Sequence, residues 1–325
     1  MQPWPPRSEF FPDCTPPRLP TLGSLMRTFA YFLGLILLGL VSIAVFAYPA
    51  WLLLHPHFEF PFHRIGERIG MLALGLGFVV TARRLGLRDR TSLGYGLTRL
   101  EFLREASIGL TLGVATMSAV VGLMTALGLL DWTAAAGVTA GALAQLVVLR
   151  LLSGLAVAFI EETFLRGAMY TGIERESGSR AAVILTAVVY SATHFFASFR
   201  IPAAEVSASS GALLLAGTLQ SFAHPLGIAD AFLCLLAVGI LLGRVRAATG
   251  NIAACVGLHA GWVWVMLVVH ALAQPVRLTP LSFLLSRFDG FVGWLVLAWT
   301  IPVSLALQRF YAAGTGANGA SASSR

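Results

Sequence analysis

The sequence predicts an all-α fold, a polytopic bundle of about eight transmembrane helices, and three observations lead to this prediction. Hydrophobic residues make up 57% of the 325 residues, and the mean hydropathy is +0.80. Charged residues make up only 11%, less than half of the roughly 25% that is usual in soluble domains. The apolar residues also gather in runs that reach the roughly 20 residues a helix needs to cross a bilayer. One soluble core cannot hide so many apolar side chains, so much of the surface must face lipid.

The two ends of the chain are predicted to differ from the part between them. Residues 1–25 are rich in proline and polar residues, which predicts a disordered N-terminal tail, and they lack the short apolar core of a signal peptide. Residues 26–310 are predicted to form one transmembrane helical domain, because no polar stretch is long enough for a second domain. Residues 311–325 are predicted to form a disordered C-terminal tail.

Eight apolar runs within this domain predict the membrane spans. The second run is weakened by Glu67 and Arg68, and the fourth is interrupted by Arg150 before it continues into residues 161–170. Residues 207–222 are apolar but rich in serine and glycine, and they fit either a re-entrant segment or an extra span, so seven or nine spans stay open. The eight runs occupy residues 29–54, 65–82, 106–130, 132–160, 181–199, 226–243, 251–272 and 291–307.

The arginines predict how these spans are oriented. All basic residues are arginine, the formal net charge is +7, and the most basic loop lies between residues 83 and 104. The positive-inside rule places this loop in the cytoplasm, and eight spans threaded from it put both termini there too. Glu161 and Glu162 then fall toward the cytoplasmic half of the membrane. Arginines placed between apolar runs contact lipid headgroups, so we predict no nucleic-acid partner. The arginine-only, Ala- and Gly-rich composition favours a bacterial inner membrane.

Two adjacent glutamates end the fourth apolar run, in the segment EETFLRG. A charge in hydrocarbon costs at least about 2.5–3.5 kcal/mol, so such groups face a partner or a water-filled cavity. Glu162 and Arg166 are four residues apart on one helix face, in the order that favours an ion pair. Glu161 is rotated about 100° from Glu162 and stays free to accept a proton. Alternatively, both glutamates mark a helix end at the interface and pair with Arg150 and Arg166.

A histidine lies in each of two further spans, His194 in YSATHFF and His259 in GLHAGW. Either ring alone is explained equally well by a hydrogen bond within the membrane. Ionisable groups on three separate spans instead favour a shared cavity in the bundle. There, Glu161 would take a proton from water, while the histidines would hold that water or the oxyanion that forms.

Three segments resemble the motifs of the CPBP family, which includes CAAX prenyl endopeptidases, their bacterial relatives and bacteriocin-processing or self-immunity proteins. The family pattern is EExxxR, FxxxH and HxxxN on three helices, and the similar segments are EETFLRG, YSATHF and GNIAACVGLHAGW, within about residues 145–266. The resemblance implies an intramembrane endopeptidase that hydrolyses a peptide bond in a membrane-anchored protein or peptide. It implies that Glu161 activates water and that Glu162 and Arg166 organise the site. It also implies that His194 and His259 position the water and stabilise the tetrahedral intermediate.

The sequence departs from the family pattern at two positions. Tyr190 stands where the second motif has Phe, and its hydroxyl adds a hydrogen-bonding group. Val263 stands where the third motif has Asn, so an amide donor to the oxyanion is missing. Losing one such donor lowers the rate by about 10²–10³. Asn251 and Thr193 are the candidates to replace it, and both a weakened enzyme and a catalytically silent protein stay open.

The resemblance also raises the question of a metal ion, because the family has often been described as metalloproteases. Glu161, His194 and His259 would then be the ligands of a divalent metal such as zinc. The sequence lacks HExxH, in which two ligands share one helix face, so we predict no obligatory metal or other cofactor. Two other functions stay open. One is a non-catalytic immunity or scaffold protein, and the other is a proton-coupled transporter in which Glu161 and His194 relay protons.

Overall fold

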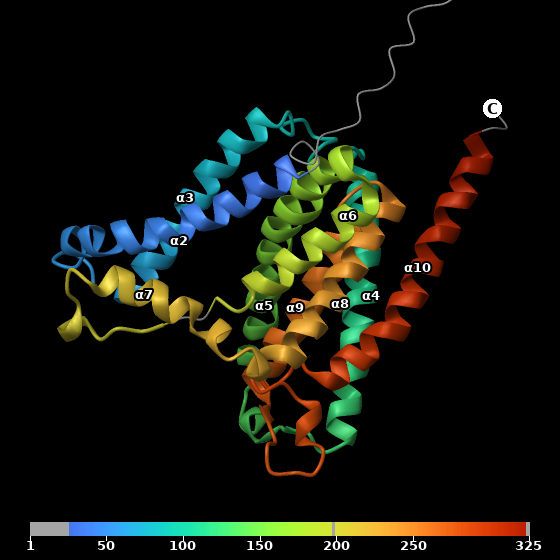
Figure 1. The fold of residues 1–325 in the computed structure, drawn as a ribbon. Helices are drawn as coiled ribbons and strands as arrows, with labels where there is room; N and C mark the ends of the chain where they lie inside the picture. The colour runs from blue at the N-terminus through green and yellow to red at the C-terminus, as the bar shows by residue number, and fades with distance from the viewer. Residues whose placement is uncertain (1–25, 197–198, 323–325) are drawn as a thin grey trace, which may run out of the picture.

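The structure, a computed structural model, describes residues 26–196 and 199–322, with side chains described as far as Tyr311. Long α-helices dominate it, which confirms the predicted fold class (Figure 1). The only strands among these residues are β1 (Leu130–Asp131) and β2 (Gln274–Pro275), which pair antiparallel between two loops. The helices are α2 (Arg27–Leu54), α3 (Phe62–Arg84), α4 (Arg99–Ala126), α5 (Ala140–Glu162), the π-helix η3 (Thr163–Met169), α6 (Tyr170–Thr193), α7 (Ser210–Leu219), α8 (Pro225–Thr249), α9 (Ala253–Leu272) and α10 (Trp294–Ala322), with short 3-10 turns at Thr133–Ala135, Ala203–Glu205, Gln220–Ala223 and Ser282–Leu284.

Six helical stretches of the described residues are long and apolar enough to cross a membrane. One of them, Ala140–Thr193, holds two of the predicted spans, because the backbone leaves helical geometry at Gly178 (φ 82°, ψ 166°). The eighth predicted run lies in α10, which is not among the six. Ser210–Ala223, where the sequence left the span count undecided, is a shorter apolar helix. The protein is therefore a multi-pass helical membrane protein, while the count of eight spans stays a prediction.

The structure describes most of the predicted C-terminal tail but not the predicted N-terminal tail. Residues 1–25 lie outside the described residues. α10 extends to Ala322 and so includes most of the segment for which a C-terminal tail was predicted.

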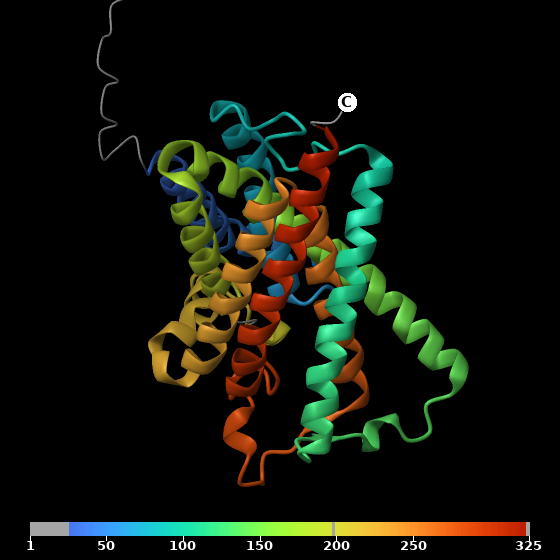
Figure 2. The same ribbon diagram turned by 90° about the vertical axis from the view of Figure 1, so that its right-hand side faces the viewer.

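The helices form two groups that meet at α5 and α6. Figure 1 shows α2, α3 and α7 together on one side and α4, α8, α9 and α10 on the other. Figure 2 shows that the loop between α3 and α4 lies at one end of the bundle. The loops that follow α4 and α9 lie at the opposite end in both views. We call these two ends the arginine end and the ladder end, since the second contains β1 and β2.

Glycines allow α9 to lie against α4 in backbone contact. Gly257 and Gly261 on α9 face Gly109 and Gly113 on α4, and a Cβ at any of the four would fall 2.0–2.7 Å from a backbone atom of the other helix. Small residues allow membrane helices to approach closely, which replaces the missing hydrophobic driving force with van der Waals contact. α9 is consequently buried all the way along residues 253–261, and His259 is held on a rigid element.

Candidate active site

The segment EETFLRG lies where α5 changes into the π-helix η3. π-turns are rare in proteins and often occur at functional sites. A Cβ at Gly167 would fall 2.6 Å from the carbonyl oxygen of Leu93, so glycine is needed for the loop between α3 and α4 to pack here. Glu162 and Arg166 both lie fully inside the bundle, with 0% of their area exposed. Two charged side chains are thus enclosed at the junction of these helices.

Glu162 is the centre of a buried hydrogen-bond network. Its Oε1 accepts from Nη1 of Arg166 at 3.0 Å and from Nδ1 of His259 at 2.8 Å. Arg166 also donates from Nη2 to the carbonyl oxygen of Gly239, and its guanidinium lies 4.6 Å from the centroid of the Tyr190 ring. The expected pairing of Glu162 with Arg166 is therefore confirmed. The hydrogen bond from His259 to Glu162 was not predicted, because no local spacing indicates it.

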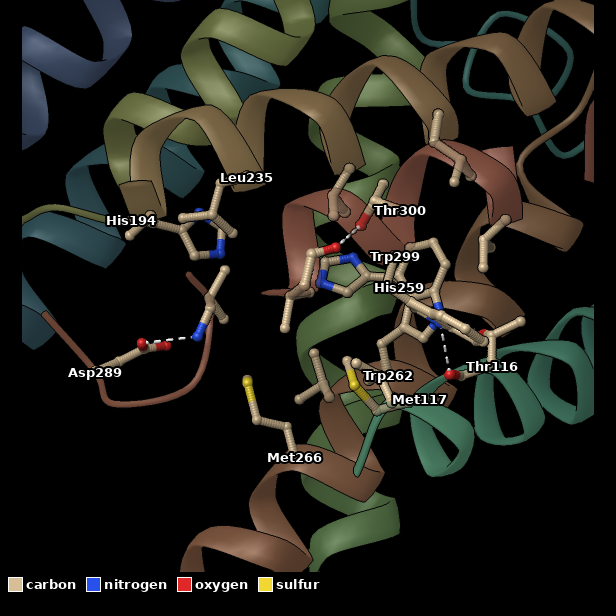
Figure 3. A pocket seen from close by; sticks show the side chains of 18 of the residues that line it. Thr116, Met117, His194, Leu235, His259, Trp262, Met266, Asp289, Trp299 and Thr300 are labelled. Carbon is tan, nitrogen blue, oxygen red and sulfur yellow. Dashed lines mark hydrogen bonds between the residues drawn. The ribbon is translucent and has the colours of Figure 1, made fainter. Parts of the chain in front are cut away.

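His194 and His259 both line one cavity of about 140 Å³, and Figure 3 shows their rings in its wall. The ring of Tyr190 also lines the cavity, with its centroid 4.5 Å from that of His194 and 5.8 Å from that of His259. Most of the remaining wall is apolar and comes from α4, α8, α9, α10 and the loop before α10. Val263, at the position where the motif has an amide, is part of this wall. Two of the three expected ionisable groups thus share a cavity.

Hydrogen bonds to the two Nδ1 atoms determine what each ring presents to the cavity. Nδ1 of His194 lies 2.7 Å from the carbonyl oxygen of Tyr190, and Nδ1 of His259 lies 2.8 Å from Glu162. Both partners are acceptors, so each Nδ1 carries the proton, and Nε2 of a neutral ring is then an acceptor. When the two imidazoles are neutral, the Nε2 atom of each can therefore accept a hydrogen bond but cannot donate one.

Glu161 is placed differently from its neighbour. Its Oε2, like that of Glu162, is completely enclosed without a hydrogen-bond partner. Unlike Glu162, Glu161 forms no ion pair with Arg166 and no hydrogen bond with His259. It does not line the cavity. It does interact electrostatically with Tyr190, a residue of the cavity wall. The structure thus brings Glu162, and not Glu161, into contact with a histidine.

The match with a known family covers this part of the chain. Residues 142–265 match the family model described as type II CAAX prenyl endopeptidase Rce1-like. This segment is an Rce1-like CAAX protease domain. The match spans less than half of the chain, includes all five residues of the predicted site and agrees with the predicted core at about 145–266. No curated protein and no solved structure matches the chain significantly.

Neither residue proposed to replace the missing amide lies on the cavity that contains His194 and His259. Oδ1 of Asn251 accepts from the backbone N–H of Ala253, and its amide donates to Glu105, so this side chain holds the start of α9. Oγ1 of Thr193 donates to carbonyl oxygens of its own helix. Both side chains are therefore engaged away from the cavity, Asn251 by Glu105 and nearby backbone groups and Thr193 by its own helix.

The metal alternative requires Glu161, His194 and His259 to converge in the Rce1-like domain. Across the part of the chain that the structure describes, no three His, Cys, Asp or Glu side chains are grouped so that they could hold a metal ion. Glu161 forms no hydrogen bond with either ring and does not line the cavity that holds them, so the three expected ligands do not converge on one site. The prediction that no metal is obligatory is not tested by this arrangement.

The cavity that contains His194 and His259 extends toward the ladder end of the bundle. Phe288, Asp289 and Val292 belong to the loop before α10, and all three line the cavity. The predicted orientation makes this the outer end, whereas the same orientation led us to expect the site in the cytoplasmic half.

Proposed function

We propose that the protein is an integral membrane endopeptidase that hydrolyses a peptide bond in a membrane-anchored protein or peptide. The observation that carries this proposal is the 2.8 Å hydrogen bond from His259 to the buried Glu162, on the wall of a cavity that also contains His194. A water molecule there would meet two Nε2 acceptors in surroundings that largely exclude bulk water. The mostly apolar wall suits the apolar part of a membrane-anchored substrate.

Glu161 is the proposed base that takes the proton from this water. Its enclosed Oε2 has no partner, so its lone pairs are not used by the protein. Because Glu161 does not line the cavity, its side chain must turn toward Tyr190 to reach the water. Glu162 offers a second route, since it orients His259 and would stabilise the imidazolium formed when Nε2 takes the proton. This is the logic of the Asp–His pair in serine proteases.

Substitutions at Glu161 and at His259 separate the two routes. Peptide mass profiles of membranes with and without the protein would first identify product peptides. We expect Glu161→Gln to abolish these products, and Glu205→Gln, at an exposed glutamate in a 3-10 turn outside the cavity, to leave them unchanged. Unchanged products in Glu161→Gln with loss in His259→Ala would transfer the base role to His259. Unchanged products in both variants would contradict the hydrolase proposal.

We further propose a location in a bacterial inner membrane with both termini in the cytoplasm. The six apolar helical stretches support a multi-pass protein, and the arginines of the loop between α3 and α4 support this orientation. If membranes containing the wild-type protein yield no product peptides, the result would favour a non-catalytic scaffold or a proton-coupled transporter over a protease. Proton-coupled flux in liposomes without proteolysis would identify the transporter.

A further inference from the structure

Hydrolysis in this cavity requires a hydrogen-bond donor for the carbonyl oxygen that becomes negative in the tetrahedral intermediate. Such donors usually supply the largest single contribution to catalysis of acyl transfer. The inference below rests on the proposed function. Neither histidine supplies the donor in its neutral state, because each Nδ1 hydrogen is already bound and each Nε2 only accepts.

The other polar groups on the wall are engaged or cannot donate. The hydroxyls of Thr116 and Thr300 donate to carbonyl oxygens of their own helices at 2.8 and 2.7 Å. The indole N–H groups of Trp262 and Trp299 both donate to Thr116 at 3.0 Å. Asp289 accepts two backbone N–H groups and, when ionised, has no proton to donate. These four donors are therefore used within the protein.

Tyr190 is the lining residue whose donor stays unused. It is 3% exposed, and its hydroxyl makes no hydrogen bond to any described residue. The ring is held by the Arg166 guanidinium on its face and by edge contacts with His194 and His259. A donor fixed in this way needs no reorganisation as negative charge develops on the substrate.

We propose that the Tyr190 hydroxyl donates the hydrogen bond that stabilises the oxyanion, and so replaces the amide that is missing at Val263. Water oxygen forms a bond to the scissile carbonyl carbon, and the proton of the water moves to the base. The carbonyl π pair moves to the oxygen, which accepts the hydrogen bond from Tyr190 without taking its proton. The pair then returns to re-form C=O, the C–N bond breaks, and the protonated base gives its proton to the leaving amine.

The test compares four full-length variants in proteoliposomes with a membrane-anchored reporter peptide that the wild type is known to cleave. These are Tyr190→Phe, Val263→Asn, the double variant and Tyr48→Phe, a control on α2 outside the cavity. We expect Tyr190→Phe to lower kcat by about 10²–10³-fold with little change in KM. Val263→Asn should raise kcat more in the Tyr190→Phe background than in the wild type. Tyr48→Phe should leave both constants unchanged.

Two results would overturn the role of Tyr190. One is a folded Tyr190→Phe variant whose kcat equals that of the wild type. The other is a gain from Val263→Asn that is equal in both backgrounds, because independent positions give additive effects. Thermal melting of each variant shows whether it is folded. If no membrane-anchored peptide is found that the wild type cleaves, the proposed function itself is contradicted, so the two failures are distinguishable.

Discussion

At the scale of single residues, Glu161 and Glu162 should respond in opposite ways to loss of charge. Glu162 balances the enclosed guanidinium of Arg166, and both side chains are 0% exposed. Breaking a buried pair by removing one partner typically costs about 3–5 kcal/mol, because the other charge stays buried and unpaired. We therefore expect Glu162→Gln to lower the free energy of unfolding by about this amount. Unfolding in mixed micelles, followed by circular dichroism, measures this change.

Glu161→Gln is the matched control for that measurement. Glu161 has no hydrogen-bond partner, so removing its charge should leave stability unchanged or raise it. Equal destabilisation by the two substitutions would show that Glu161 also neutralises a buried cation.

Local spacing explains which of these residue contacts could be predicted. The Glu162–Arg166 pair joins neighbours on one helix face, so the interval of four residues was sufficient. The bond between His259 and Glu162 joins residues 97 positions apart. Helical periodicity indicates the face of the helix on which a side chain lies. Which other helix packs against that face depends on the tertiary fold. For the same reason, the sequence suggested Glu161 as the partner of the rings and did not reveal which ring nitrogens were already bound.

At the scale of elements, the contact between α4 and α9 should be sensitive to one methyl group. A Cβ at Gly113 would fall 2.5 Å from the carbonyl oxygen of Leu258, next to His259. We expect Gly113→Ala to lower the free energy of unfolding by about 1–3 kcal/mol, the usual cost of overpacking. It should also reduce product formation, because α9 must shift. Gly122→Ala is the control on α4, since a Cβ there meets nothing within 4 Å. Similar melting of both variants would contradict backbone contact between the helices.

The elements themselves were predictable where hydropathy alone defines them. The long helices follow the apolar runs closely, because in lipid each helix satisfies its own backbone hydrogen bonds. The π-helix η3 was not predicted, since it depends on packing around Gly167 and Arg166 and leaves no hydropathy signal. The continuation of the fourth run into residues 161–170 was predicted, whereas the turn at Gly178 was not, because the backbone conformation of one glycine leaves no hydropathy signal.

At the scale of the whole molecule, the direction in which the cavity opens depends on how the bundle is inserted. The cavity reaches the ladder end, while the arginines of the loop between α3 and α4 lie at the other end (Figure 1). Retention of arginine-rich loops in the cytoplasm would direct the cavity toward the outer face. The substrate would then be cleaved near the outer leaflet, in contrast to the cytoplasmic access that the sequence suggested.

Single cysteines at the two ends would determine the insertion. Cys234 and Cys255 are buried, so a chain with Cys14→Ser is a suitable background. Arg88→Cys and Leu278→Cys place thiols at exposed positions, Leu278 being 98% exposed. We expect a membrane-impermeant maleimide added to intact cells to label Leu278→Cys at once and Arg88→Cys only after permeabilisation, because crossing arginine-rich loops is disfavoured. The reverse pattern would turn the cavity toward the cytoplasm. Labelling of both positions in intact cells would contradict a bundle whose two ends lie on opposite sides of the membrane.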